Sequence, residues 1–368
     1  MVTPERITLA RRRRGLAVTE LARHLGVTAQ TVTDFEHGRR EPDQAGMARI
    51  AQVLGFPAAF FEAEVLEEMP EDALSFRARS KLSQRKRAAA VSAGVLAVEF
   101  NQWLEQRFVL PKPDVPDFEQ SDPVTAAEMT RAAWGLGVHP VPNMVHLLEA
   151  YGVRVFSLAV EHAEIDAFSF WQDNTPFVFL NTTKTPERSR FDAAHELGHL
   201  VLHGGARETY GQEAEREADA FAGAFLMPEL SIRGRMPNAP LLDQVVKGRS
   251  IWRVSALALT YRLRELGMFT DEQYRTTCVE LSRLGYRQAE FSGLIGESSQ
   301  LLGKVFAALK DQGTSMRDLA AEVRLSPDDL AGMVFGLVVT AVGSPGRGNE
   351  SRRDLDDPPS SPARLTLA

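Results

Sequence analysis

The segment His195-Glu-Leu-Gly-His199 places two imidazoles four residues apart, with the carboxylic acid Glu196 beside the first. On a helix, residues i and i+4 lie on one face, so both imidazoles can bind one cation while Glu196 lies next to a water molecule. A catalytic zinc ion takes three protein ligands and keeps one position open. The spacing therefore predicts a zinc site that activates water, with Glu196 as general base.

A second helix is expected to supply the third ligand, from Glu215-Arg-Glu-Ala-Asp219. Glu215 and Asp219 share a helix face, so Glu215 is the predicted ligand and Asp219 the predicted acceptor for the other N–H of a ligand histidine. Glu217 points away from Asp219 on such a helix and ranks below Glu215, and Glu213 ranks lower still. Two histidines and one carboxylate are thus the predicted donor set.

Two other side chains are candidates for supporting roles. His203 continues the stripe of His195 and His199, but three ligands on successive turns of one straight helix cannot converge on a tetrahedral ion. We therefore expect His203 to pack or to contact a ligand. An acyl-transfer site also needs a donor for the oxyanion, and His203 and Tyr210 are both candidates. The run Ser189 to Asp192 predicts a capping box at the start of the metal-binding helix.

Composition narrows the class of metal site and the compartment. One cysteine in 368 residues excludes an intramolecular disulfide framework and a zinc site with two or more thiolates. The first residues lack the apolar core of a secretory signal, and no apolar run reaches the roughly 20 residues that a membrane helix needs. We therefore expect a cytoplasmic protein with no membrane partner.

The net charge of −7 is unevenly distributed along the chain. Residues 1–61 carry nine arginines and six acidic residues, a net +3, which leaves −10 for the remainder. This division indicates a small basic module on an acidic body. Within the module, residues 19–28 predict a helix, a turn at Gly26 and a second helix with Thr28 as N-cap. The pattern is typical of a helix-turn-helix, whose second helix enters the major groove.

The basic module resembles the phage-repressor (XRE/Cro) helix-turn-helix family at Leu21-Ala22, Gly26-Val27-Thr28, Val32, Phe35-Glu36, Gly38-Arg39 and Pro42. The resemblance implies double-stranded operator DNA as partner. Gln30 can pair with adenine, and Thr33 can contact a base or a thymine methyl. Asp34 repels phosphate and suits only a cytosine amino group. The predicted DNA-contacting set is Thr28, Gln30, Thr31, Thr33, Asp34, Arg39 and Arg40, in which the two arginines suit phosphate oxygens. The alternative is a module that binds protein instead.

A longer pattern resembles the ImmA/IrrE family of metallopeptidase-like proteins over about residues 141–290. Its elements are Phe177-Val-Phe-Leu-Asn181, Arg190-Phe191, Ala193 to His203, Glu215 to Ala222, Leu226-Met-Pro228 and Trp252 to Glu290. The resemblance implies a gluzincin-type, zinc-dependent endopeptidase that cleaves a repressor or antitoxin partner at a specific site. Members often carry an XRE module on the same chain, and residues 75–83 are similar to their connector.

The fold is expected to be mainly α with a small β-sheet. Strands are predicted at residues 153–158, 166–171 and 177–181, ahead of the metal-binding helix. Residues 169–171 or 177–180 are expected to pair with an extended substrate by strand addition. The predicted domains are a helix-turn-helix bundle at 1–65, a basic helical linker at 66–120, an α+β zincin-like peptidase domain at 121–290, a helical region at 291–342 and a disordered tail at 343–368.

Together these features predict a DNA-binding transcriptional regulator of bacterial or phage type, nucleoid-associated and homodimeric, with one zinc ion per chain and an endopeptidase domain. The alternative is a transcription factor or antitoxin whose peptidase-like domain senses a ligand, metal or partner without proteolysis. Glu196 favours retained chemistry, because a structural zinc site needs no base. The fused helix-turn-helix favours regulation.

Overall fold

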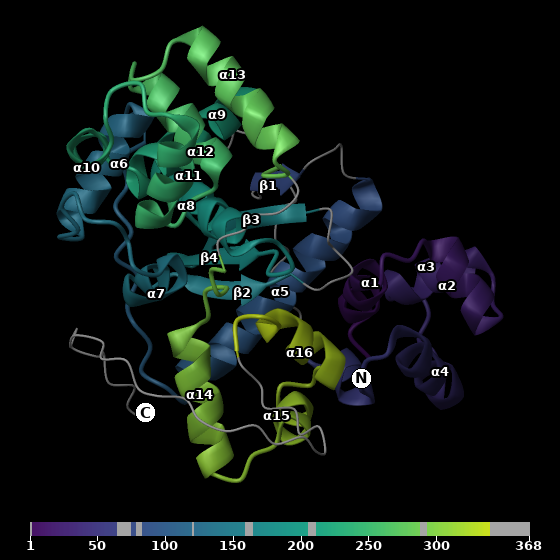
Figure 1. Ribbon diagram of the computed structural model, residues 1–368. Helices are drawn as coiled ribbons and strands as arrows, with labels where there is room; N and C mark the ends of the chain where they lie inside the picture. The colour runs from purple at the N-terminus through teal and green to yellow at the C-terminus, as the bar shows by residue number, and fades with distance from the viewer. Residues whose placement is uncertain are drawn as a thin grey trace, which may run out of the picture.

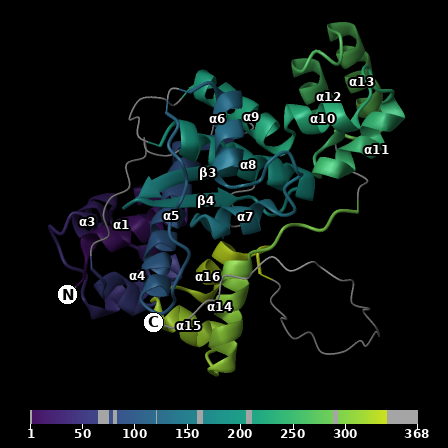
Figure 2. The ribbon, with the colours of Figure 1, turned by 90° about the vertical axis from the view of Figure 1, so that its left-hand side faces the viewer.

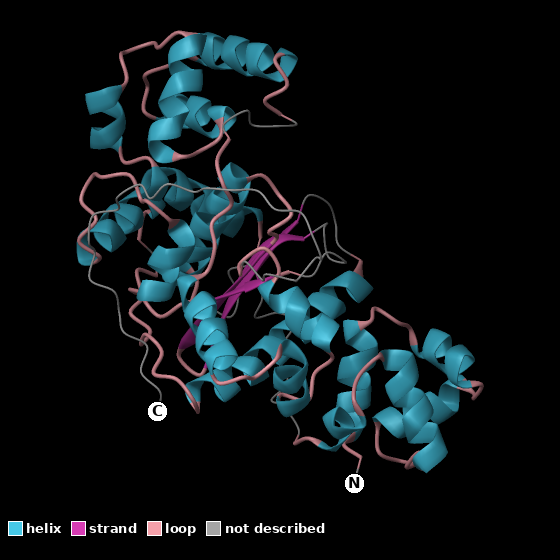
Figure 3. Ribbon diagram, turned by 60° about the horizontal axis from the view of Figure 1, so that its bottom comes forward, coloured by secondary structure: helices cyan, strands magenta, loops and turns pink. Residues whose placement is uncertain are grey.

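A four-stranded sheet lies between helices in the middle of the molecule (Figures 1 and 3). The computed structural model describes residues 2–64, 83–119, 121–158, 165–204, 211–287 and 293–338, together with the backbone of 75–78. Within these ranges the chain is mainly helical, as the sequence predicts. No helix among them is both long and apolar enough to cross a bilayer.

The N-terminal helices form a small bundle. Gly26 ends one helix in the left-handed conformation (φ 70°), and the Thr28 side chain accepts the Thr31 N–H to cap the next, so the predicted helix–turn–helix geometry is confirmed. Arg11 and Glu36 form a bidentate pair inside the bundle. The elements are α1 (Pro4–Arg13), α2 (Val18–Leu25), α3 (Ala29–Glu36), α4 (Gln44–Leu54) and the 3₁₀ helix η1 (Ala58–Glu62).

The sheet has the strand order β1-β3-β4-β2. Only the β2–β4 pair is parallel; the other two pairs are antiparallel. Asp173 and Asn174, with φ values of 49° and 59°, join β3 to β4, as a two-residue hairpin turn requires. The strands are β1 (Ser75–Ala78), β2 (Arg154–Ser157), β3 (Ile165–Gln172) and β4 (Thr175–Leu180).

Neither strand that was expected to receive a substrate has an open edge. β3 pairs with β1 on one side and with β4 on the other, while β4 lies between β3 and β2. The expectation that 169–171 or 177–180 is available for strand addition is therefore wrong for this arrangement. Pairing on both sides already uses the backbone groups of these strands.

Each face of the sheet packs against a different helix. Alternate residues of β3 and β4 build an aromatic face, on which Phe168 and Phe179 stack with ring centroids 4.5 Å apart. Phe156 of β2 continues this face and contacts Phe100 of α5 (Gln84–Glu105), whose centroid is 6.2 Å away. The opposite face carries Ser169 and Trp171, which bind the backbone or side chains of α8 (Pro186–Leu202).

Helix α8, which carries the predicted histidine ligands, begins earlier than the sequence predicts. Its N-cap is Thr185 and its first residue is Pro186, so the predicted capping box from Ser189 to Asp192 is wrong. Proline favours the first helical position, since its missing N–H needs no partner there. Asp192 instead lies inside the helix and binds Lys184 at 2.9 Å.

Helix α9 (Gln212–Leu226) packs closely on α8 because Gly198 has no side chain. A Cβ on Gly198 would lie 3.2 Å from the Cα of Ala218 and 3.1 Å from the Phe221 ring. This close approach brings the first turns of α9 over the middle of α8.

The remaining helices form two groups on opposite sides of the sheet (Figures 1 and 2). The group at the C-terminal end reaches the N-terminal bundle, where Asp329 binds Arg14 at 2.7 and 2.8 Å and Arg13 at 3.1 Å. Between α5 and β2 in the chain come α6 (Pro123–Ala133) and α7 (Met144–Ala150). The first group is α10 (Glu229–Arg235), α11 (Leu242–Trp252), α12 (Ala256–Glu265) and α13 (Asp271–Arg283), and the second is α14 (Gln300–Asp311), α15 (Met316–Glu322) and α16 (Pro327–Val334).

Candidate metal centre

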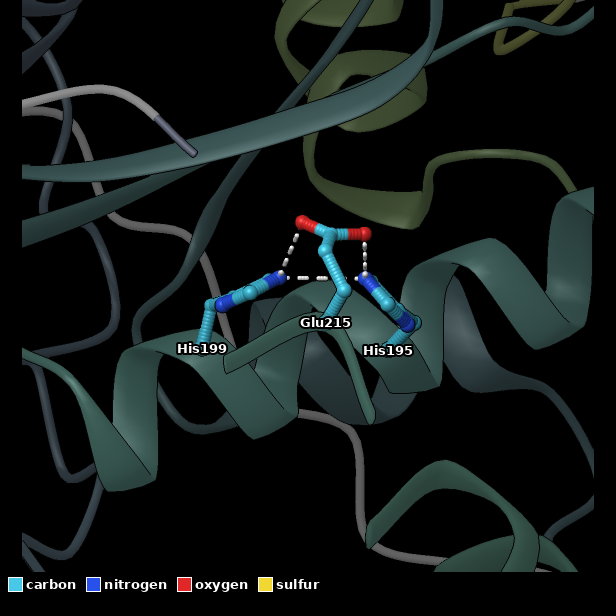
Figure 4. Close-up of side chains that lie close together, drawn as sticks. All are labelled: His195, His199 and Glu215. Atoms are coloured by element: carbon cyan, nitrogen blue, oxygen red, sulfur yellow. Dashed lines mark hydrogen bonds and ion pairs between the residues drawn. The ribbon is translucent and has the colours of Figure 1, made fainter. Parts of the chain in front are cut away.

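Three predicted ligands from α8 and α9 converge on one point (Figure 4). The Nε2 atoms of His195 and His199 are 3.0 Å apart. One Glu215 oxygen lies 3.5 Å from the first and the other 3.4 Å from the second. Two ligands at 2.0–2.1 Å from a tetrahedral zinc ion are separated by about 3.3 Å, so this spacing fits zinc.

The other ring nitrogen of each ligand histidine is engaged, which fixes the ring orientation. The Nδ1 atom of His195 lies 2.9 Å from Asp219, as the sequence predicts. The Nδ1 atom of His199 lies 3.1 Å from Nδ1 of His203, whose Nε2 lies 2.8 Å from Glu217. Such contacts leave Nε2 of each ligand with its lone pair toward the metal.

Glu217 has a role that the sequence reasoning missed. Its position on α9 relative to Asp219 ranked it low as a ligand, but it reaches His203 and, through it, His199. The signal available in the sequence was the third histidine, which needed a partner of its own. Glu213 pairs with Arg216 on the surface. Tyr210 lies outside the described residues.

The electrostatics of the three ligands suit a divalent cation. Burial lowers the pKa of His199 to about 4, so this ring is neutral at neutral pH. Burial alone would raise the pKa of Glu215, but hydrogen bonds and charge interactions with His195 and His199 hold it well below its ordinary value. The donor set is therefore two imidazoles and one ionised carboxylate.

Glu196 is fully buried beneath β3, where Ser169 donates its hydroxyl hydrogen to Oε2 at 2.6 Å. Sequence reasoning did not select Ser169. The signal in the sequence was that Ser169 carries a hydroxyl group among alternate residues of β3 that face α8 and are otherwise apolar. The hydrogen bond fixes the carboxylate relative to His195 and His199 on the same helix.

Charged residues fasten the start of α8 to the sheet. Lys184, which precedes the helix, binds Asp192 at 2.9 Å and also pairs with Asp166 of β3. Arg188 on the first turn binds the other oxygen of Asp166 at 2.9 Å. These ion pairs link the strand that carries Ser169 to the helix that carries Glu196.

In the N-terminal bundle, Asp34 on α3 contacts two of the predicted DNA-contacting side chains. Gln30 donates to it at 2.9 Å, and Arg39 lies 3.7 Å away. Thr33 donates to the Ala29 carbonyl at 3.1 Å. Thr28 and Thr31 share the cap of α3, and Arg40 lies over Phe35. Gln30, Arg39, Arg40 and Thr28 are exposed, and Thr31, Thr33 and Asp34 are half-buried.

Comparisons with known protein families agree with this division of the chain. Residues 5–63 match the family model of a helix-turn-helix domain, and residues 148–264 match that of the IrrE N-terminal-like domain. A search of curated proteins finds no match. The chain thus carries a helix-turn-helix domain followed by an IrrE N-terminal-like, metallopeptidase-like domain. Both resemblances drawn from the sequence are confirmed.

Proposed function

We propose that the protein is a DNA-binding transcriptional regulator whose IrrE-like domain is a zinc-dependent endopeptidase acting on a protein partner, such as a repressor or an antitoxin. One observation carries the proposal. The ligand atoms of His195, His199 and Glu215 lie within 4.8 Å of one another. The buried carboxylate of Glu196 lies on the same helix as the two histidines. A purely structural zinc site has no need of that carboxylate.

The residues around the site divide the work of peptide hydrolysis. Zinc, when bound, supplies Lewis acidity, which polarises a peptide carbonyl and lowers the pKa of water to near ~7. Glu196 accepts the water proton and delivers it to the leaving amine. Ser169 keeps the Glu196 carboxylate in place. Both ring nitrogens of His203 face His199 and Glu217, which favours a supporting role over oxyanion binding.

The helix-turn-helix is proposed to bring the peptidase to its partner on DNA. Gln30 and Thr33 would face base edges, and Arg39 and Arg40 would face phosphates. Proteins of this type read two half-sites, which favours a homodimer. A soluble, nucleoid-associated location follows from that role and belongs to the same proposal.

The decisive experiment compares the wild-type protein with the Glu196→Gln variant on proteins encoded by neighbouring genes. Both should hold one zinc per chain by elemental analysis, and only the wild type should cleave a partner. His195→Ala and Glu215→Ala should lose stoichiometric zinc. Cleavage that persists in Glu196→Gln would remove this residue as the base. Stoichiometric zinc with no cleavage of any partner would favour regulation without proteolysis.

A further inference from the structure

The proposed catalytic base contacts β3, whose outer edge pairs with β1. β3 is held to α8 through Ser169 and the Glu196 carboxylate. Its inner edge is used by β4. An extended peptide that adds to β3 can therefore enter only along the outer edge, which is the edge that β1 covers.

β1 is a short strand that comes from far away in the sequence. It lies between the DNA-binding bundle and α5, about 90 residues before β3, and among the described strands it pairs with β3 alone. The pairing is antiparallel, with Ser75 opposite Ser169 and Arg77 opposite Ala167. The register shifts after Arg77, so only a few residues hold the strand in place.

The register sets the β1 backbone directly beside the base. Opposed residues of an antiparallel pair have Cα atoms about 4.5–5.5 Å apart. Ser75 is therefore one strand spacing from Ser169, the residue that holds Glu196. A peptide substrate paired with β3 would place its own backbone there. The two chains cannot occupy this edge together.

We propose that β1 is an internal competitor for the substrate edge, and that the peptidase site accepts an extended peptide, antiparallel to residues 167–169, only when β1 is displaced. This proposal rests on the proposed function, since it concerns access to the same site. The chain is held in place both before and after β1. Arg6 donates to the Glu64 carbonyl at 2.8 and 3.0 Å on the N-terminal side, and Ser83 caps α5 on the C-terminal side.

The first test weakens β1 and measures peptide binding to the full-length protein. Neighbouring amides on a strand point to opposite sides, so Phe76→Pro/Arg77→Pro removes whichever N–H faces β3. The probe is a fluorescein-labelled synthetic peptide of residues 71–82, with a scrambled peptide as control. All proteins also carry Glu196→Gln, so the probe is not cleaved.

The double-proline variant should bind the probe about tenfold more tightly than the protein with intact β1, by fluorescence anisotropy. The apparent affinity falls with the fraction of molecules whose edge is open, which is the reason for this gain. Equal affinities would overturn the proposal. Weaker binding by the variant would also overturn it, because β1 would then be part of the peptide-binding surface.

A crosslink provides a second test that needs no disruptive substitution. Arg77 and Ala167 are opposed in the register, within the roughly 4.4–6.8 Å Cα separation of a disulfide. Arg77→Cys/Ala167→Cys in a Cys278→Ser background should bind no probe when oxidised and regain the parent's affinity after reduction with a phosphine. Undiminished binding by the oxidised form would contradict the proposal. Zinc content and melting temperature of each variant establish that it is folded.

Cleavage is measured separately, in proteins that keep Glu196. If the double-proline variant binds the probe tightly but neither it nor the wild type cleaves any partner, the proposed function fails and the role of β1 stands. If a partner is cleaved at equal rates with and without an intact β1, the role of β1 fails and the proposed function stands.

Discussion

At the residue scale, the two histidines of the candidate metal site are oriented by groups outside the proposed ligand set. Asp219 orients His195, while Glu217 orients His199 through His203. The second arrangement is longer, since a histidine lies between the carboxylate and the ligand. Because Glu217 lies on α9, the orientation of the His199 ring depends on how α9 packs against α8.

The Glu217–His203 contact should contribute to zinc affinity. We expect Glu217→Gln to lower that affinity about tenfold, and Asp219→Asn about 10–100-fold, because each removes an acceptor that orients a ligand ring. Competition with a chromogenic chelator measures the change. Glu213→Gln on the same helix is the matched control, since Glu213 binds only the exposed Arg216 in the described structure. A loss as large in the control would refute this role.

At the element scale, the approach of α9 to α8 sets the position of Glu215. The contact depends on Gly198, where a Cβ would meet the backbone of Ala218 and the Phe221 ring. Gly198 of α8 thus allows α9 to come close enough for Glu215 to approach His195 and His199.

Gly198→Ala should therefore lower both stability and zinc affinity. Overpacking costs about 1–3 kcal/mol, which exceeds the gain of up to about 1 kcal/mol in helix propensity. Denaturant unfolding of the metal-free protein and chelator competition measure the two effects. Gly303→Ala in α14 is the control, because nothing lies within 4 Å of its added Cβ, and it should be neutral or stabilising. A stable Gly198→Ala protein with full zinc affinity would contradict the packing argument.

Gln30 on α3 and Arg39, just after that helix, should have separable effects on DNA binding. Gln30→Ala should relax sequence preference, whereas Arg39→Ala should weaken binding to all sequences and reduce the slope of log affinity against log salt by about one. Both side chains contact Asp34 in the described structure. Binding titrations at several salt concentrations test this. Absence of any DNA binding at low salt would instead favour a protein-binding module.

The helices and their spacing could be predicted from the sequence better than the sheet could. The i, i+4 spacing placed His195, His199 and Glu215 without knowledge of the fold. The predicted capping box from Ser189 to Asp192 placed the start of α8 about one turn too late. The helix begins at Pro186, a residue that favours the first helical position. β1 was missed because four residues carry little periodicity, and its partner is about 90 residues away. Pairing over such a distance depends on the packed core and leaves little local signal.

At the scale of the whole molecule, the C-terminal helices connect the DNA-binding bundle to the sheet. Asp329 of α16 is buried against Arg13 and Arg14 at the end of α1. At the other end of the same region, the Phe335 carbonyl accepts a hydrogen bond from Thr182, just after β4. Helix α16 and the residue after it thus contact both the N-terminal bundle and the chain just after β4.

The Asp329 contact should stabilise the protein in a pH-dependent way. Burial favours the neutral carboxyl, but the hydrogen bond from Arg14 and the charges of Arg13 and Arg14 hold the pKa of Asp329 below its ordinary 3.8. A lowered folded-state pKa means that the stabilisation is complete above the unfolded value and is lost as pH falls through the folded one.

Asp329→Asn should therefore cost about 3 kcal/mol of unfolding free energy from pH 7 to pH 5, because it leaves buried arginines without their counter-charge. The difference from wild type should shrink as pH falls below 4. Urea unfolding across this range measures it, with the exposed neighbour in Asp328→Asn as control. A constant difference down to the acid limit would exclude Asp329 ionisation as its source.

If β1 covers the substrate edge of a peptidase as proposed, its covalent attachment has a consequence for which proteins could be cut. A tethered segment competes at an effective concentration on the order of millimolar, whatever the amount of protein in the cell. A target diffusing freely at micromolar levels is then outcompeted, while one bound beside the enzyme on the same stretch of DNA meets it on equal terms. The target would then be selected by its binding position on the DNA as much as by recognition of its side chains.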